Sequence, residues 1–147
     1  MDDKEFLELA IKQSELSVRQ GLFPSGALVV LKDKIIASET SDLYPGHQHA
    51  ESKAVDNAFS KKRTLKEATL YASMEPCLMC ITRAYWVGIR RIVYAIRKNS
   101  VRQEYYERER DNEEIVGSFN ESIEYLQISE LEKEARRIVK TWENKRR

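Results

Sequence analysis

His49, Cys77 and Cys80 are the residues whose types and spacing point most clearly to chemistry. The chain contains two histidines and two cysteines, and three of these four residues lie in two short stretches, His49-Ala50-Glu51 and Pro76-Cys77-Leu78-Met79-Cys80. Imidazole nitrogen and thiolate sulfur are ligands that zinc prefers, and three protein ligands leave a fourth tetrahedral position open for water. The spacing therefore predicts a catalytic zinc site rather than a structural one.

Glu51 supplies the second part of that chemistry. It follows His49 by two residues, so on a helix it can reach the neighbourhood of the zinc without being a ligand. A carboxylate in that place can take a proton from water and deliver it elsewhere, which is general acid–base catalysis. We therefore predict that Glu51 is the catalytic residue of a hydrolase. His47 is either a further ligand or a histidine at the rim of the pocket.

The two stretches are predicted to begin helices. Pro76 suits the start of a helix, and Cys77 and Cys80 are three residues apart, so both sulfurs share one face of its first turn. The unpaired amides and the dipole of that turn favour thiolates. His49 likewise opens a helix, so two helix N-termini are expected to point at one metal ion.

The remaining elements follow from the pattern of apolar residues. Four segments have helical spacing: 3–19, 49–61, 77–87 and 129–145. In the last of these, Ser129 is predicted to be the N-cap and Glu132 occupies the capping-box position. Five segments are rich in strand-forming residues: 26–31, 35–37, 68–73, 91–96 and 122–128. The charged, tyrosine-bearing stretch 97–112 receives no assignment.

This order of elements predicts an α/β fold. We expect a three-layer α/β/α sandwich, in which helices cover both faces of a central mixed five-stranded sheet. The chain has 147 residues and no repeats, low-complexity tracts or linkers. We therefore expect a single domain over 1–147, with 129–147 as a C-terminal helix.

Composition limits the classes of function. Lys and Arg total 25 against 24 Asp and Glu, so the bulk basic field that draws nucleic acid is absent. The clusters Arg90-Arg91, Arg97-Lys98 and Lys145-Arg146-Arg147 are either a local basic patch or solvated surface charge. No apolar stretch has membrane-spanning length, the N-terminus is acidic rather than signal-like, and the two cysteines do not form a secreted disulfide framework. We expect a cytoplasmic protein.

The two motifs together resemble the zinc-dependent cytidine/deoxycytidylate deaminase superfamily, whose signature is H-x-E followed by P-C-x-x-C. The resemblance runs from about residue 4 to residue 97 and includes Pro24-Ser25-Gly26-Ala27 and the stretch 70–80. Glu75-Pro76-Cys77 is most similar to the branch that holds guanine deaminases and tRNA-specific adenosine deaminases. Tyr85-Trp86 is similar to the guanine deaminase version. The implied fold is cytidine deaminase-like.

The resemblance implies Zn²⁺ as the cofactor and hydrolytic removal of the exocyclic amine from a nucleobase or nucleoside, with a guanine-type or related ring favoured. It implies substrate contacts from the backbone N–H of Ala50 and the backbone carbonyl of Glu75. Where the family usually has a substrate-binding asparagine, this chain has Ser41 or Asp42, and Phe23 stands in for a base-stacking aromatic residue. The expected partners are a small-molecule substrate and a second copy in a homodimer.

Three alternatives compete with this interpretation. A tRNA-specific adenosine-to-inosine deaminase would need a basic surface beside the pocket, which the near-neutral charge disfavours. A non-catalytic zinc-binding partner subunit commonly lacks the glutamate that is present here as Glu51. A C-x-x-C redox protein would leave His49 and Glu51 unexplained. The sequence predicts no role for residues 97–120 or for the C-terminal helix.

Overall fold

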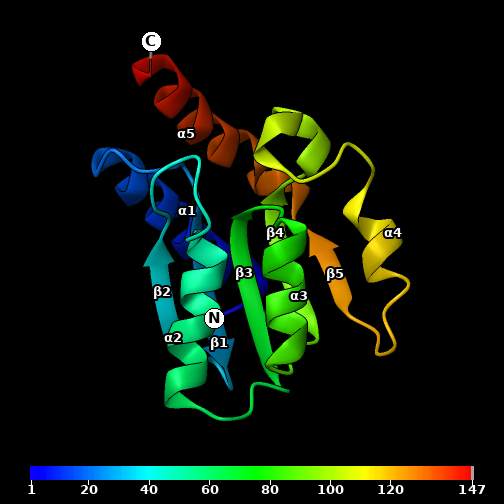
Figure 1. Cartoon of the computed structure of the whole chain (residues 1–147). Coiled ribbons are helices and arrows are strands. Elements are labelled where there is room, and N and C mark those ends of the chain that lie inside the picture. The colour runs from blue at the N-terminus through cyan, green and yellow to red at the C-terminus, as the bar shows by residue number, and fades with distance from the viewer. Residues whose placement is uncertain (147) are drawn as a thin grey trace.

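The computed structural model describes residues 1–146, and its strands form one mixed sheet (Figure 1). The sheet has five strands in the order β2-β1-β3-β4-β5: β1 (Gly26–Leu31), β2 (Lys34–Thr40), β3 (Ala68–Met74), β4 (Arg91–Ile96) and β5 (Glu124–Gln127). β1 pairs antiparallel with β2 and β3, whereas β4 runs parallel to both β3 and β5. The predicted α/β class with a mixed five-stranded sheet is confirmed.

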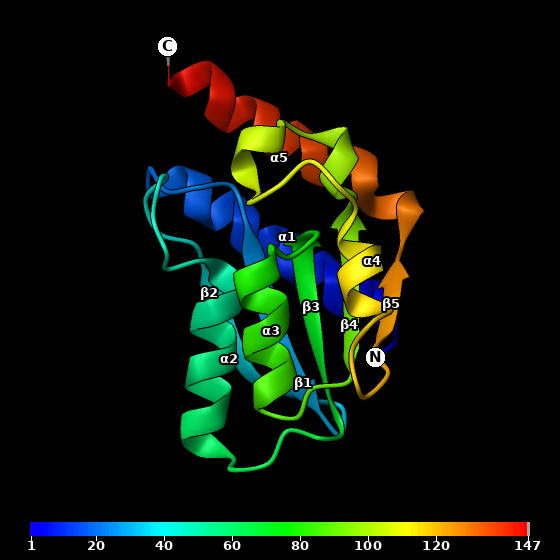
Figure 2. The same ribbon diagram turned by 45° about the vertical axis from the view of Figure 1, so that its right-hand side comes forward.

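Helices cover both faces of this sheet, as the predicted three layers require (Figure 2). One face carries α1 (Asp3–Arg19) and α5 (Glu132–Lys145), and the other carries α2 (Ala50–Lys61) and α3 (Leu78–Trp86). Neighbouring strand residues point to opposite faces, so Tyr71 and Val93 enter the core under α1, while Leu70 and Ile92 enter the core under α2 and α3. The sheet thus holds α2 and α3 side by side.

The start of the last helix differs from the prediction. Ser129 does not cap α5, because residues Ser129–Leu131 form a 3₁₀ turn and Leu131 is the N-cap. The carboxylate of Glu132 is engaged elsewhere: its Oε1 accepts hydrogen bonds from the Arg97 backbone N–H at 3.1 Å and from Gln127 Nε2 at 3.0 Å. It therefore joins the ends of β4 and β5 instead of closing a capping box. The last residue of the predicted segment 129–147 lies outside the described residues.

The stretch 97–112, which had no assignment, contains the 3₁₀ turns η1 (Lys98–Ser100) and η2 (Gln103–Tyr105), and the short helix α4 (Asn112–Val116) begins at its last residue. Buried polar contacts hold it in place. Lys98 Nζ donates to Gln103 Oε1 at 2.8 Å and to the Glu109 carbonyl at 2.9 Å, and Asn112 Nδ2 donates to the Pro76 carbonyl at 2.9 Å. The segment is therefore anchored beside the second predicted motif.

None of the helices within residues 1–146 combines the length and the apolar character that crossing a membrane requires.

Gly26 allows α1 to lie directly against β1. A methyl group at this position would overlap the Ala10 carbonyl oxygen and the Ser14 backbone nitrogen, and it would lie 2.6 Å from Gln13 Cβ. Because backbone atoms cannot move aside cheaply, we expect Gly26→Ala to lower the free energy of unfolding by about 2–3 kcal/mol. Urea denaturation measures this loss, and an unchanged midpoint would show that α1 does not pack this closely.

Asp3 links α1 to the sheet through Arg91, whose Nη1 donates to Asp3 Oδ1 at 2.7 Å. This hydrogen bond is the largest cause that holds the pKa of Asp3 below its ordinary value. A lowered folded-state pKa contributes stability above the unfolded pKa, and that stability disappears as the pH falls through the folded-state pKa. We expect Asp3→Asn to cost about 1 kcal/mol at pH 7 and less at about pH 3, which lies below the ordinary pKa of 3.8. Unfolding curves at both pH values test this, with Glu130→Gln as an exposed ion-pair control.

Candidate active site

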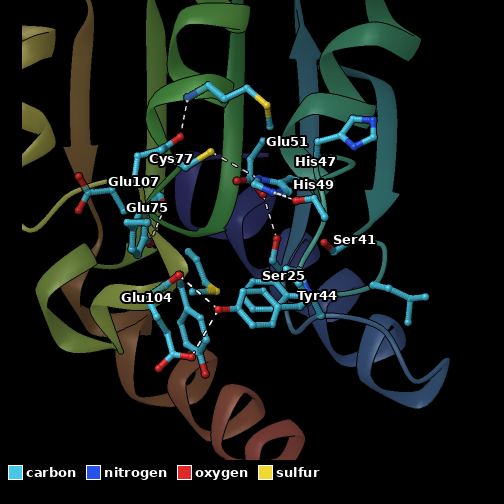
Figure 3. A pocket seen from close by; sticks show the side chains of 18 residues that line it. Ser25, Ser41, Tyr44, His47, His49, Glu51, Glu75, Cys77, Glu104 and Glu107 are labelled. Carbon is cyan, nitrogen blue, oxygen red and sulfur yellow. Dashed lines mark hydrogen bonds between the residues drawn. The ribbon is translucent and has the colours of Figure 1, made fainter.

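The residues singled out by the two motifs meet where α2 and α3 begin. His49 is the N-cap of α2, and its backbone N–H donates to Ser52 Oγ at 2.9 Å. Cys77 follows the end of β3 and is the N-cap of α3, and Cys80 lies in the first turn of that helix. Figure 3 shows His49 and Cys77 pointing toward one another. The predicted convergence of two helix N-termini is therefore present.

The donor atoms of His49, Cys77 and Cys80 form one group. Nδ1 of His49 lies 3.4 Å from Cys77 Sγ and 3.6 Å from Cys80 Sγ, and the three atoms all lie within 4.8 Å of one another. A tetrahedral zinc with ordinary Zn–N and Zn–S bond lengths places nitrogen and sulfur about 3.6 Å apart. The donor set and its spacing therefore fit zinc. His47 is exposed and lines the cavity, outside this group.

A hydrogen bond orients the imidazole of His49 for metal binding through Nδ1. Its Nε2 lies 2.8 Å from the Gly46 carbonyl oxygen, so a proton on Nε2 is donated there and Nδ1 is left as the free donor atom. The two thiols lie close together in this group. Their interaction is the largest cause that lowers the pKa of Cys77 to about 6 and raises the pKa of Cys80, so Cys77 is the thiol that ionises more readily.

Glu51 lies in the first turn of α2 with its side chain almost fully buried, at 4% exposed. Ser25 Oγ donates to Glu51 Oε1 at 2.9 Å and holds the carboxylate in one orientation. Burial raises the pKa of Glu51 to about 7, because removal of water disfavours the charged form. A carboxyl group of this pKa can both accept and release a proton near neutral pH.

Both carboxylate oxygens of Glu75 accept hydrogen bonds from other residues of the chain. Its Oε1 accepts from the Lys98 backbone N–H at 2.8 Å, and its Oε2 accepts from the Tyr125 hydroxyl at 2.6 Å. Its backbone carbonyl, the predicted substrate contact, accepts from the Tyr106 hydroxyl at 2.7 Å. A carbonyl oxygen has a second lone pair, which this arrangement leaves for another donor.

A cavity of about 330 Å³ opens in front of these residues. Phe23, Ser41 and Glu75, the predicted substrate contacts, line it together with His49, Glu51 and Cys77. Ala50 is fully buried and is not among the described residues that line it. The prediction for Ala50 concerned its backbone N–H, and it stays a prediction.

Phe23 does not stand alone in the cavity wall. Its ring stacks on Tyr44 with centroids 5.3 Å apart, and it meets the edges of Tyr105 at 5.2 Å and Trp142 at 5.1 Å. Trp142 belongs to α5, so the C-terminal helix supports one wall of the cavity from behind. This contact gives the C-terminal helix the role that its sequence pattern did not reveal.

Sequence reasoning missed the residues that close the other side of the cavity: Glu104, Tyr105, Tyr106 and Glu107. They come from the stretch without apolar periodicity. Clustered tyrosine and glutamate residues were the available signal, but composition alone does not say which part of the fold such a stretch contacts. Ser25 was noted only within its motif, and its hydrogen bond to Glu51 depends on how β1 meets α2.

Comparison with known proteins agrees with the motifs. The family model for the cytidine and deoxycytidylate deaminase zinc-binding region matches residues 1–96. A probable cytosine deaminase of Schizosaccharomyces pombe is 35% identical over 102 residues, which cover 67% of this chain and 63% of that protein. A tRNA-specific adenosine deaminase of Buchnera aphidicola is 32% identical over 106 residues, which cover 69% and 65%. The chain thus matches slightly less than two thirds of each relative.

Solved structures agree in fold. The guanine deaminase from Nitrosomonas europaea superimposes with a TM-score of 0.79 at 22% identity, covering 93% of this chain and 82% of that one. At this identity the likeness concerns the fold alone. The family is shown by the match over residues 1–96, which contains both motifs. The chain therefore belongs to the cytidine and deoxycytidylate deaminase family and contains its zinc-binding region.

Proposed function

We propose that this chain is a zinc-dependent hydrolytic deaminase, which removes the exocyclic amine of a nucleobase or nucleoside and releases ammonia. A guanine-type or related aminated ring is the favoured substrate. The observation that carries the proposal is the buried carboxyl group of Glu51, held by Ser25 beside the His49, Cys77 and Cys80 donor group. The curated relatives described above are named as deaminases, which supports it.

Metal binding, proton transfer and positioning fall to different residues of the site. His49, Cys77 and Cys80 would hold the zinc, which when bound lowers the pKa of water and so provides a nucleophile at neutral pH. Glu51 accepts a proton from water and delivers it to a ring nitrogen. Glu51 then takes the second proton of that water, now on the oxygen attached to the ring, and passes it to the departing amine, so the ring gains oxygen and loses ammonia, with one water consumed. Ser25 positions Glu51 for both transfers.

The cavity favours a small substrate. Its volume of about 330 Å³ is near the lower end of the range for small-molecule sites. Aromatic side chains on one wall, Phe23 and Tyr44, offer flat apolar surface to a planar ring. The homodimer, the cytoplasmic location and the single domain over 1–147 stay predictions.

An ammonia-release assay tests the proposal. Zinc-loaded protein is incubated with guanine, cytosine, adenine, their nucleosides and related aminated rings, and metal-free protein serves as the control. We expect release from one ring or a small set of related rings, and none without zinc. Absence of release from every ring with fully zinc-loaded protein would contradict the proposal.

Deamination of adenosine in a tRNA loop is the second candidate, since tRNA-specific adenosine deaminases are among the relatives. The same assay with tRNA as substrate decides between the two: inosine in the tRNA, with free bases untouched, would favour this candidate. The non-catalytic partner subunit is less well supported, because Glu51 is present, buried and oriented by Ser25.

A further inference from the structure

Acidic residues predominate among the charged side chains that line the cavity. Four carboxyl groups face or border it, from Glu51, Glu75, Glu104 and Glu107, and no lysine or arginine is among the described residues of its wall. Phosphate groups are bound in proteins by Arg and Lys side chains and by free amides at helix N-termini. The wall therefore lacks the first of these two kinds of phosphate ligand.

Free amides at a helix N-terminus, the second kind of phosphate ligand, are present, but a side chain of this protein already occupies them. The backbone N–H groups of Leu78 and Met79, in the first turn of α3, donate to the two carboxylate oxygens of Glu107, each at 3.1 Å. Glu107 thus fills the anion-binding position that the helix would otherwise offer to a substrate phosphate. A phosphate would have to displace a carboxylate of this chain to bind there.

Glu104 places a further negative charge on the far side of the cavity. Figure 3 shows Glu104 and Tyr44 together, away from Glu51 and Cys77. The Tyr44 hydroxyl lies 3.3 Å from the Glu104 carbonyl oxygen and 3.4 Å from Oε2 of its carboxylate, so these residues join the two walls. Two cations lie near this pair: Arg102 Nη1 is 3.8 Å from Glu104 Oε1, and the guanidinium of Arg146 lies 5.3 Å from the centre of the Tyr44 ring. The side chains of Arg102 and Glu104 are both more than half exposed, so water and salt weaken the ion pair between them.

We propose that Glu104 is a specificity-determining residue that excludes phosphate-bearing rings, so that the substrate is the uncharged base or nucleoside and not its nucleotide. This inference rests on the proposed function. A ring whose amine reaches Glu51 extends its remaining substituents away from the donor group, toward Tyr44 and Glu104. A phosphate carried on such a substituent would place a second negative charge beside the carboxylate of Glu104, and like charges repel.

The test compares a base, its nucleoside and its 5′-monophosphate on the same ring, with zinc-loaded protein. We expect kcat/KM for the monophosphate to be at least about tenfold below that for the nucleoside. In Glu104→Lys this discrimination should fall by about tenfold, and in Glu104→Gln by an intermediate amount. Glu130→Lys is the matched control: it makes the same charge change at an exposed site on the α5 side of the molecule, and it should leave the discrimination unchanged.

Two outcomes would overturn the inference. The first is a kcat/KM of the unaltered protein for the monophosphate that equals its kcat/KM for the nucleoside. The second is a Glu104→Lys variant that discriminates as strongly as Glu130→Lys. Calorimetric binding of the same three compounds to zinc-loaded Glu51→Ala separates recognition from turnover. If no form of any ring binds or reacts, the proposed function itself is wrong, and the inference fails with it.

Discussion

Replacement of Glu51 by alanine is expected to lower kcat by at least about a thousandfold while zinc content stays near one ion per chain. The reason is that Glu51 is not one of the three donor residues, yet it is the buried group placed to carry protons beside them. Loss of the carboxylate removes proton transfer both to the ring and to the departing amine. Ammonia release and metal analysis on the same preparation measure the two effects separately.

Two further variants sharpen the Glu51 experiment. Glu51→Gln keeps the size of the side chain but cannot exchange protons, and we expect it to be as inactive as the alanine variant. Ser25→Ala removes only the hydrogen bond that orients Oε1, so a loss of about tenfold is expected. Substantial activity in Glu51→Gln would show that another group moves the protons.

The second large effect is expected at Cys80. This thiol is fully buried, and the variant Cys80→Ser should lose zinc during dialysis and unfold at the temperature of the metal-free protein. A hydroxyl is a much poorer zinc ligand than a thiolate, whereas the change in packing volume is small. Metal analysis and thermal unfolding with and without added Zn²⁺ measure the loss.

The matched control for Cys80 is Met79→Leu, which changes the preceding residue of the same helix turn and leaves the donor group intact. It should keep one zinc per chain. If Cys80→Ser retains zinc at the same stoichiometry and the same unfolding temperature, Cys80 is not a ligand, and the site must use a different third donor.

Much of the fold was predictable because its signals are local. The strands and helices that carry His49 and Cys77 have clear apolar periodicity, and their predicted bounds differ from the structure by few residues. Ser129 shows the limit of local signals. Its spacing to Glu132 matches a capping box, but the carboxylate of Glu132 accepts hydrogen bonds from the backbone of Arg97, 35 residues away, and from the side chain of Gln127.

The donor group and Glu51 could be predicted for a different reason. Their side chains lie at fixed short spacings at helix starts, so sequence alone determines most of their geometry. The opposite wall could not be predicted, because Glu104 and Glu107 belong to 3₁₀ turns and irregular chain held by tertiary contacts such as the Lys98 ammonium. The specificity proposed for Glu104 depends on that wall, and the two zinc motifs carry no information about it.

The central claim is that zinc held by this chain and the carboxyl group of Glu51 act together in deamination. Titration of the metal-free protein with Zn²⁺, with ammonia release recorded from its preferred ring, tests this claim most directly. The expected result is a rate that rises in proportion to added zinc, stops rising at one ion per chain, and is absent at every zinc level in Glu51→Ala. Full ammonia release by the metal-free chain, or a zinc-dependent rise of equal size in Glu51→Ala, would contradict it.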